Sequence, residues 1–171
     1  MIKKYWMSVI GGLAITMMAM TAAHAADKVI VATFGDPIPA QMAAHDGKLS
    51  AATGWNVEWR KFNSGADVIA AMASGDVNIA ELGSSPLAIA ATQGVDLQVF
   101  MIDYVIGQAE SLIVRNGSGI KSLADLKGKV VAVPIGSTSH FSLMGALKHA
   151  GIGENDLTIL NMSPEQIVAA W

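Results

Sequence analysis

Short apolar runs alternate with polar segments along most of the chain, and turn-forming residues separate one run from the next. Runs rich in β-branched residues predict strands, whereas longer runs with helical periodicity predict helices. The predicted strands are residues 28–33, 55–60, 77–82, 97–102, 110–115, 129–133 and 157–161. The predicted helices are residues 39–52, with a weak point at Asp46-Gly47, 66–74, 87–93, 140–149 and a last one from Pro164. This alternation predicts an α/β fold of mostly parallel sheets with flanking helices.

The first 25 residues follow a different pattern. Lys3 and Lys4 precede an apolar run over residues 7–23, and Ala23-His24-Ala25 closes it with a small-x-small motif. These are the three parts of a secretory signal peptide, so we expect cleavage after Ala25 and a periplasmic mature chain. An uncleaved membrane anchor is the alternative, but the run is short for a span of about 20 residues.

Composition excludes several classes of function. The 171 residues carry a formal net charge of −3 and include no cysteine. Disulfides, thiolate metal sites and a lipid-anchoring cysteine are therefore excluded, which favours a free periplasmic protein. No basic stripe is present, so we expect no nucleic-acid partner. We also expect no membrane insertion of the mature chain.

Enzyme and cofactor motifs are missing from the chain. It has no Gly-x-Gly-x-x-Gly fingerprint, no complete Walker A loop and no Gly-x-Ser-x-Gly elbow. His45, His140 and His149 lack the i, i+4 spacing of a helical metal site, and we expect a structural or surface role for His45 and His149. The sequence therefore predicts no catalytic residue, no metal and no cofactor.

Polar loops of small residues follow three of the predicted strands: residues 34–36, 83–85 and 136–140. Ligands of open α/β sheets bind at this carboxyl edge. The second and third loops combine hydroxyls with free N–H groups at a helix N-terminus, which suits an anion. Ser84, Ser137 and Thr138 are the candidates for binding, while Ser85 and Ser139 have helix capping as an equally good explanation.

Glu110 is the complementary candidate. It follows Gly107-Gln108-Ala109 and precedes an apolar run. An exposed acid at a strand end is the ordinary alternative. Beside an anion site, an acid makes sense only if the ligand also carries a cation.

The last residues predict a helix that the chain leaves unfinished. Ser163, Pro164 and Gln166 provide a cap, a favourable first position and a capping box. The chain then ends at Trp171. We expect the chain to be a fragment. The Asn-Gly-Ser-Gly turn at 116–119 predicts a boundary between one lobe, residues 26–115, and the first half of a second, residues 116–171.

Several blocks together resemble the sulfonate, nitrate and taurine substrate-binding family of ABC importers, and within it the periplasmic taurine-binding proteins. The blocks are residues 59–66, 73–77, 82–88, 128–134, 137–143, 146–149 and 167–171. The resemblance implies a two-lobed, periplasmic-binding-protein-like α/β fold of about twice this length, with its second half missing here. It also implies a permease with a cytoplasmic ATPase as partner.

The resemblance further implies which residues bind. Residues Gly83, Ser84 and Ser85 would hold a sulfonate from one lobe, and Ser137, Thr138, Ser139 and His140 from the other. Glu110 would pair with the ammonium group of taurine. Gln108, Asp36 and Trp171 complete the predicted ligand-binding set.

Alternatives remain open. The ligand could be another alkanesulfonate, nitrate or a similar small anion. An exported enzyme would need His140 to activate Ser137 or Ser139, although neighbouring residues on a helix do not face each other. The piece could also lack function by itself, with strand edges left unpaired.

Overall fold

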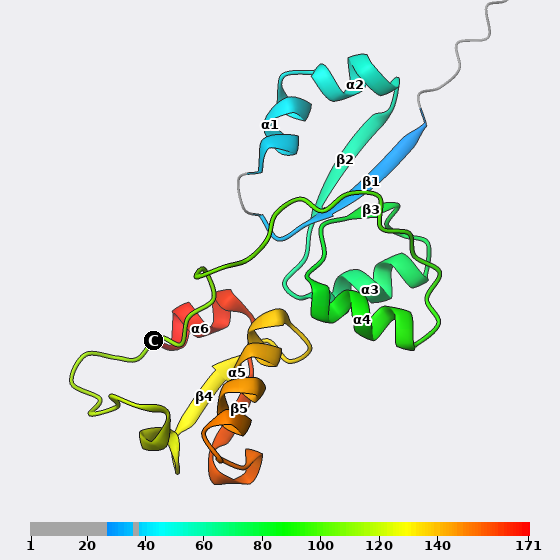
Figure 1. Ribbon diagram of the computed structural model, residues 1–171. Coiled ribbons are helices and arrows are strands. Elements are labelled where there is room, and N and C mark those ends of the chain that lie inside the picture. Colours follow the sequence, from blue (N-terminus) through cyan, green and yellow to red (C-terminus); the bar gives the residue numbers. More distant parts are fainter. Residues whose placement is uncertain (1–26, 36–37) are drawn as a thin grey trace, which may run out of the picture.

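The computed structural model describes residues 27–35 and 38–171, which form two parallel sheets with their own helices (Figure 1). The predicted signal peptide, its cleavage site after Ala25 and the candidate Asp36 lie outside the described residues. We call residues 27–92 the N-terminal unit, residues 93–122 the connection and residues 123–171 the C-terminal unit. The expected α/β class with parallel strands and flanking helices is confirmed.

The N-terminal unit contains a three-stranded parallel sheet in the order β2-β1-β3. Its strands are β1 (Lys28–Thr33), β2 (Asn56–Lys61) and β3 (Ile79–Ala80). Its helices are α1 (Pro39–His45), α2 (Lys48–Thr53), α3 (Gly65–Ala73) and α4 (Ser84–Thr92). The chain leaves β1 for β2 in one direction and returns past β1 to β3, so right-handed crossovers put α1 and α2 on one face and α3 on the other (Figure 1).

Turn chemistry explains several of these boundaries. The predicted helix over residues 39–52 is two helices, because Gly47 adopts φ 71° at the expected weak point. Ser64 caps α3 by accepting a hydrogen bond from the Asp67 N–H at 3.2 Å. Packing of α3 on the sheet then buries Val68, Val77 and Ala32.

The C-terminal unit is a βαβ unit built on β4 (Val130–Val133) and β5 (Thr158–Asn161), with α5 (Thr138–His149) between them. Two 3₁₀ turns, η1 (Leu123–Leu126) and η2 (Glu154–Asp156), and the helix α6 (Pro164–Ala170) complete it. Its core joins seven buried residues: Leu126, Val131, Val133, Leu143, Leu147, Ile152 and Leu157.

Two capping boxes form in this unit, and the one predicted at Ser163 is confirmed. At α6, the Ser163 hydroxyl accepts from the Gln166 N–H, and the Gln166 carbonyl oxygen accepts from the Ser163 N–H at 2.8 Å. At η1, the Asp125 carboxylate accepts from the N–H groups of Lys121 and Ser122 and from the Ser122 hydroxyl. These bonds, that of the Lys121 N–H above all, hold the pKa of Asp125 below its ordinary value.

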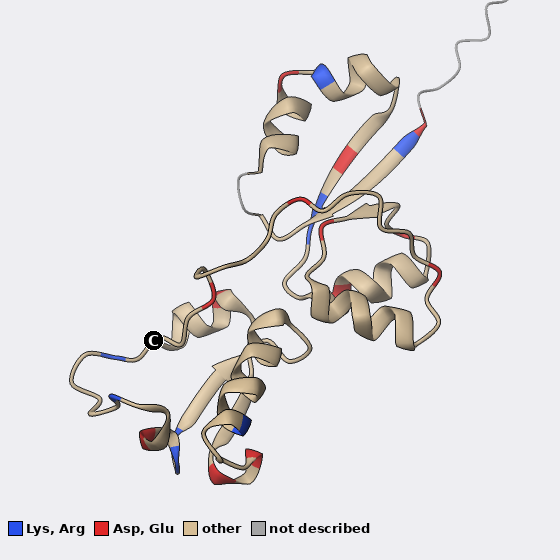
Figure 2. Ribbon diagram, in the orientation of Figure 1, with Lys and Arg blue, Asp and Glu red and all other residues tan. Residues whose placement is uncertain are grey.

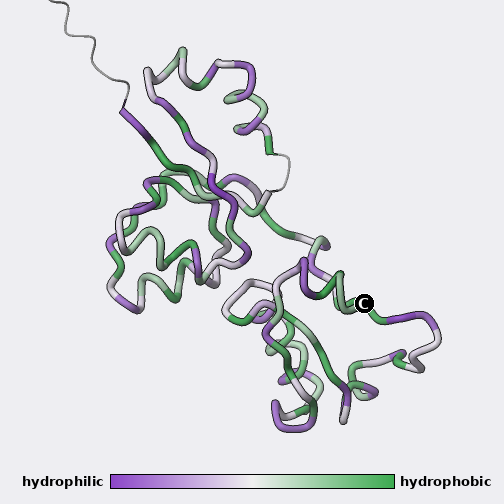
Figure 3. Tube along the Cα trace, turned by 180° about the vertical axis from the view of Figure 1, so that it is seen from behind, coloured by the Kyte–Doolittle hydropathy of each residue, from purple (hydrophilic) through white to green (hydrophobic). Residues whose placement is uncertain are grey.

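Three strand predictions were wrong in whole or in part. The predicted strands 97–102 and 110–115 lie in the connection, where the structure has neither helix nor strand. The predicted strand 77–82 forms ladder bonds only as β3. A strand forms only where its backbone pairs with that of a neighbouring strand, and the connection takes part in none of the ladders of the described residues. Its apolar stretch stays exposed instead, with Ile102 at 78% and Val105 at 87%, in a segment that is largely green in Figure 3.

Two helical glycines should respond oppositely to replacement by alanine. A Cβ on Gly65 would lie 2.6 Å from Pro86 Cγ, so Gly65→Ala overpacks the α3–α4 contact and should lower the free energy of unfolding by about 1–3 kcal/mol. Gly145, inside α5, has open space around it, so Gly145→Ala should raise that free energy by about 0.5–1 kcal/mol. Urea unfolding of both variants measures the difference, and equal effects would contradict the assigned packing.

Candidate functional site

The N-termini of α4 and α5, one from each unit, meet at the candidate site. A Cβ on Gly83, the N-cap residue of α4, would lie 3.0 Å from Thr138 Cγ2 in the first turn of α5. The structure therefore brings together the predicted loops 83–85 and 136–140. Each loop follows the carboxyl end of a strand, β3 or β4, which is where open parallel sheets present ligand-binding groups.

At the start of α4, the cap differs from the prediction. Gly83 rather than Ser85 is the N-cap residue, and Pro86 lies in the third helical position. Neither the Ser84 nor the Ser85 hydroxyl makes a hydrogen bond within the described part of the chain. The first N–H groups of a helix also lack intrahelical acceptors, so this end of α4 offers donors to an anion.

At the start of α5, the two serines exchange their expected roles. Ser137 is the cap and accepts from the His140 N–H at 3.1 Å. Ser139, for which capping was an equal alternative, instead directs its hydroxyl to Glu110 Oε1 at 3.4 Å. His140 Nδ1 accepts from the Gly136 N–H at 3.4 Å, which leaves Nε2 as a donor. Thr138 completes the hydroxyl-rich turn.

Glu110 reaches α5 from the connection, although it does not lie at the start of a strand as predicted. Its Oε2 accepts a 2.7 Å hydrogen bond from the Ser142 hydroxyl, one turn beyond Ser139. The structure thus places the predicted cation-binding carboxylate beside the hydroxyls of the predicted anion site. Glu110 is half-buried, and no lysine, arginine or histidine among the described residues forms an ion pair with it.

Gln108 and Trp171 form no hydrogen bond with these two helix ends among the described residues. Gln108 is exposed, and its carbonyl accepts only a long 3.5 Å bond from the Ser111 hydroxyl. Trp171 is exposed, and its carbonyl accepts from Arg115 Nη2 at 2.6 Å while its ring lies 6.0 Å from that guanidinium. Asp36 is outside the described residues.

Two residues that make contacts in this part of the structure were not predicted from the sequence. Lys61, at the end of β2, forms a 2.9 Å ion pair with Glu165 in the first turn of α6 and so links the two units. The Lys61 ammonium lowers the pKa of Glu165, helped by backbone N–H groups at the helix start. Ser142 is the other. The position of Lys61 directly after a predicted strand could have identified it as a candidate. Nothing in the sequence distinguishes Ser142, because it is an exposed serine on a helix.

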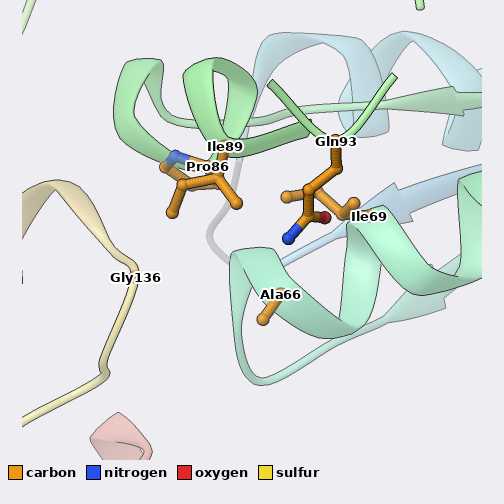
Figure 4. A pocket seen from close by; sticks show the side chains of 6 residues that line it. All are labelled: Ala66, Ile69, Pro86, Ile89, Gln93 and Gly136. Carbon is orange, nitrogen blue, oxygen red and sulfur yellow. The ribbon is translucent and has the colours of Figure 1, made fainter. Parts of the chain in front are cut away.

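A small hollow lies beside the meeting point rather than at it. Its lining is mostly apolar and comes from α3, α4, the residue directly after α4 and the Gly136 turn: Ala66, Ile69, Pro86, Ile89, Gln93 and Gly136 (Figure 4). Its volume of about 90 Å³ is bounded by one polar side chain, Gln93. None of the predicted hydroxyl or carboxylate groups lines it, so the hollow is not the predicted site.

The charges and the possible metal ligands of this region limit the kinds of ligand that it can bind. Lysines and arginines are scattered over both units and form no continuous stripe (Figure 2). Within residues 27–35 and 38–171, no three histidine or carboxylate side chains gather in a way that would hold a metal ion. Two helix N-termini, several hydroxyls and one carboxylate without an ion pair suit a small molecule that carries both an anionic and a cationic group.

Residues 40–170 match the family described as NMT1/THI5 like. The chain belongs to this NMT1/THI5-like family. Its relatives agree with the resemblance stated from the sequence. The chain is 47% identical over 133 residues to the taurine-binding periplasmic protein of Escherichia coli, an alignment that covers 78% of this chain and 41% of that protein.

Solved structures agree with the fold of this NMT1/THI5-like chain. The alkanesulfonate-binding protein SsuA from Xanthomonas axonopodis pv. citri, bound to MOPS, superposes with a TM-score of 0.71 at 26% identity, covering 85% of this chain and 52% of that one. The periplasmic aliphatic sulphonate-binding protein SsuA from Escherichia coli gives 0.64 at 27% identity, covering 85% and 48%. These relatives are named as binding proteins, not enzymes.

The NMT1/THI5-like chain spans about half the length of the relatives that it matches, or less. Among the described residues, no helix combines the length and hydrophobicity needed to cross a membrane.

Proposed function

We propose that this chain is part of the solute-binding component of an ABC importer that captures taurine and delivers it to a membrane permease driven by a cytoplasmic ATPase. In this proposal residues 26–115 form the first lobe and residues 116–171 belong to the second, so each lobe contains one of the two units and part of the connection. Residues 1–25 direct export to the periplasm and are removed after Ala25. The protein binds without catalysis.

One observation carries the choice of ligand: Glu110 lies against the hydroxyl-rich start of α5, and the start of α4 faces the same point. A sulfonate would accept hydrogen bonds from Ser84, Ser85 and Thr138 and from free helix N–H groups. Glu110 would receive the ammonium group. The relative named as taurine-binding supports this choice.

The arrangement also supports a mechanism for capture. The sulfonate donors come from both units, so a bound molecule would bridge α4 and α5. Closure of the two units around it would add contacts that only the closed form makes, which is how a ligand shifts a hinge equilibrium. Gln108, Trp171 and Asp36 stay predicted contacts that closure would bring in.

Calorimetric titration of the complete protein tests the function. We expect saturable one-to-one binding of taurine, much weaker binding of ethanesulfonate, which lacks the ammonium group, and weaker binding still of nitrate. Taurine should return chemically unchanged. An affinity for ethanesulfonate equal to that for taurine would instead favour the second candidate, an alkanesulfonate carrier. The names of the SsuA neighbours support this second candidate. Absence of heat and of a thermal shift with any sulfonate would reject both.

A further inference from the structure

Ser142 holds the Glu110 carboxylate from the second turn of α5. Its hydroxyl donates to Glu110 Oε2 at 2.7 Å, while Ser139 donates to Oε1 at 3.4 Å. The two serines are three residues apart and therefore share one face of the helix. The shorter bond is that of Ser142, so Ser142 is the stronger of the two restraints on Glu110.

Little else positions this carboxylate. Glu110 belongs to the connection, which has no helix or strand to fix its backbone, and its neighbours on both sides are exposed. No ion pair restrains it within the described part of the chain. A side chain that is not already held in place loses conformational freedom when it binds, and that loss subtracts from affinity unless the side chain is ordered beforehand.

A hydroxyl is well suited to this role. It donates one hydrogen bond and carries no charge, so it orients the carboxylate without neutralising it. A lysine or arginine in its place would compete with a cationic ligand. The two carboxylate oxygens together accept about four hydrogen bonds, which leaves positions for an ammonium group beside the two serines.

We propose that Ser142 is a positioning residue that sets the preference of the site for amino-sulfonates over plain sulfonates. The proposal rests on the function proposed above. Ser142 acts through Glu110 and need not touch the ligand. Its effect is confined to ligands whose cationic group uses Glu110.

The test compares two ligands on the complete protein and on Ser142→Ala. We expect Ser142→Ala to weaken taurine binding about three- to tenfold, the range of one lost hydrogen bond, and to leave ethanesulfonate binding within twofold. Ser142→Thr, which keeps the hydroxyl, should restore most of the taurine affinity. Ser111→Ala is the matched control, because Ser111 adjoins Glu110 and its hydroxyl bonds the Gln108 carbonyl instead.

The outcomes separate this inference from the proposed function. If the unsubstituted protein binds no taurine, both fail. If it binds taurine but Ser142→Ala changes neither ligand, or weakens both equally, the function stands and the role of Ser142 is overturned. Thermal unfolding of each variant, expected within about 1 °C of the parent because Ser142 is exposed, excludes general destabilisation as the cause.

Discussion

Glu110→Gln should weaken taurine binding by about ten- to hundredfold. The amide keeps the shape of the side chain and still accepts a hydrogen bond from Ser142, but it removes the charge that faces the ammonium group. Hydrogen bonds to charged groups contribute about 1.5–3 kcal/mol, and each 1.4 kcal/mol is a factor of ten in affinity. Calorimetric titration of the complete protein measures the change.

Ethanesulfonate makes the ligand control for this substitution. It lacks the ammonium group, so its affinity should hold or improve when the negative charge at position 110 is removed. Glu154→Gln, an exposed acid in η2, is the matched variant and should change neither affinity. A Glu110→Gln protein that binds taurine as tightly as the parent would show that the ammonium group lies elsewhere.

Leu147→Ala should lower the free energy of unfolding of the C-terminal unit by about 2–5 kcal/mol. Leu147 is 1% exposed on α5 and packs in the cluster that joins α5 to β4 and β5. Removing its branched end leaves a cavity as well as losing buried apolar area, and both terms destabilise the fold. Urea denaturation followed by circular dichroism measures the loss.

The same change at Leu160 provides the comparison. Leu160, on β5, is 42% exposed, so Leu160→Ala leaves no enclosed cavity and should have a clearly smaller effect. Equal losses at both positions would contradict the core that we assign to the C-terminal unit.

Local chemistry predicted much of the fold. The cap at Ser163 and the break at Gly47 act within a few residues, so the sequence displays both partners of each interaction. The runs 97–102 and 110–115 have strand composition as well, but composition does not show whether a neighbouring strand exists. The strand predicted at residues 77–82 was too long for the same reason, because pairing with β1, not β-propensity, sets the length of β3.

The sequence predicted which loops form the candidate site, but not the contacts of their individual side chains. Each loop could be predicted because it follows the carboxyl end of a strand. The strands β3 and β4 belong to different sheets, however, so only the family resemblance implied that loop 83–85 meets loop 136–140. Hydroxyl direction was not predictable, because it depends on tertiary neighbours. Ser137, predicted to bind the ligand, therefore caps α5, although capping was weighed for Ser139. Ser142 donates to Glu110, and nothing in the sequence around it predicted that contact.

The Lys61–Glu165 pair makes the contact between the two units more sensitive to salt than the core of either unit. Each unit has its own buried apolar cluster, and the pair joins them through side chains that are 55% and 52% exposed. Dissolved ions screen attraction between exposed charges over about 8–10 Å near physiological ionic strength but scarcely affect apolar packing. Raising the ionic strength therefore loosens the joint between the units while leaving each core intact, so the relative position of the two units responds to the ionic medium and their folds do not.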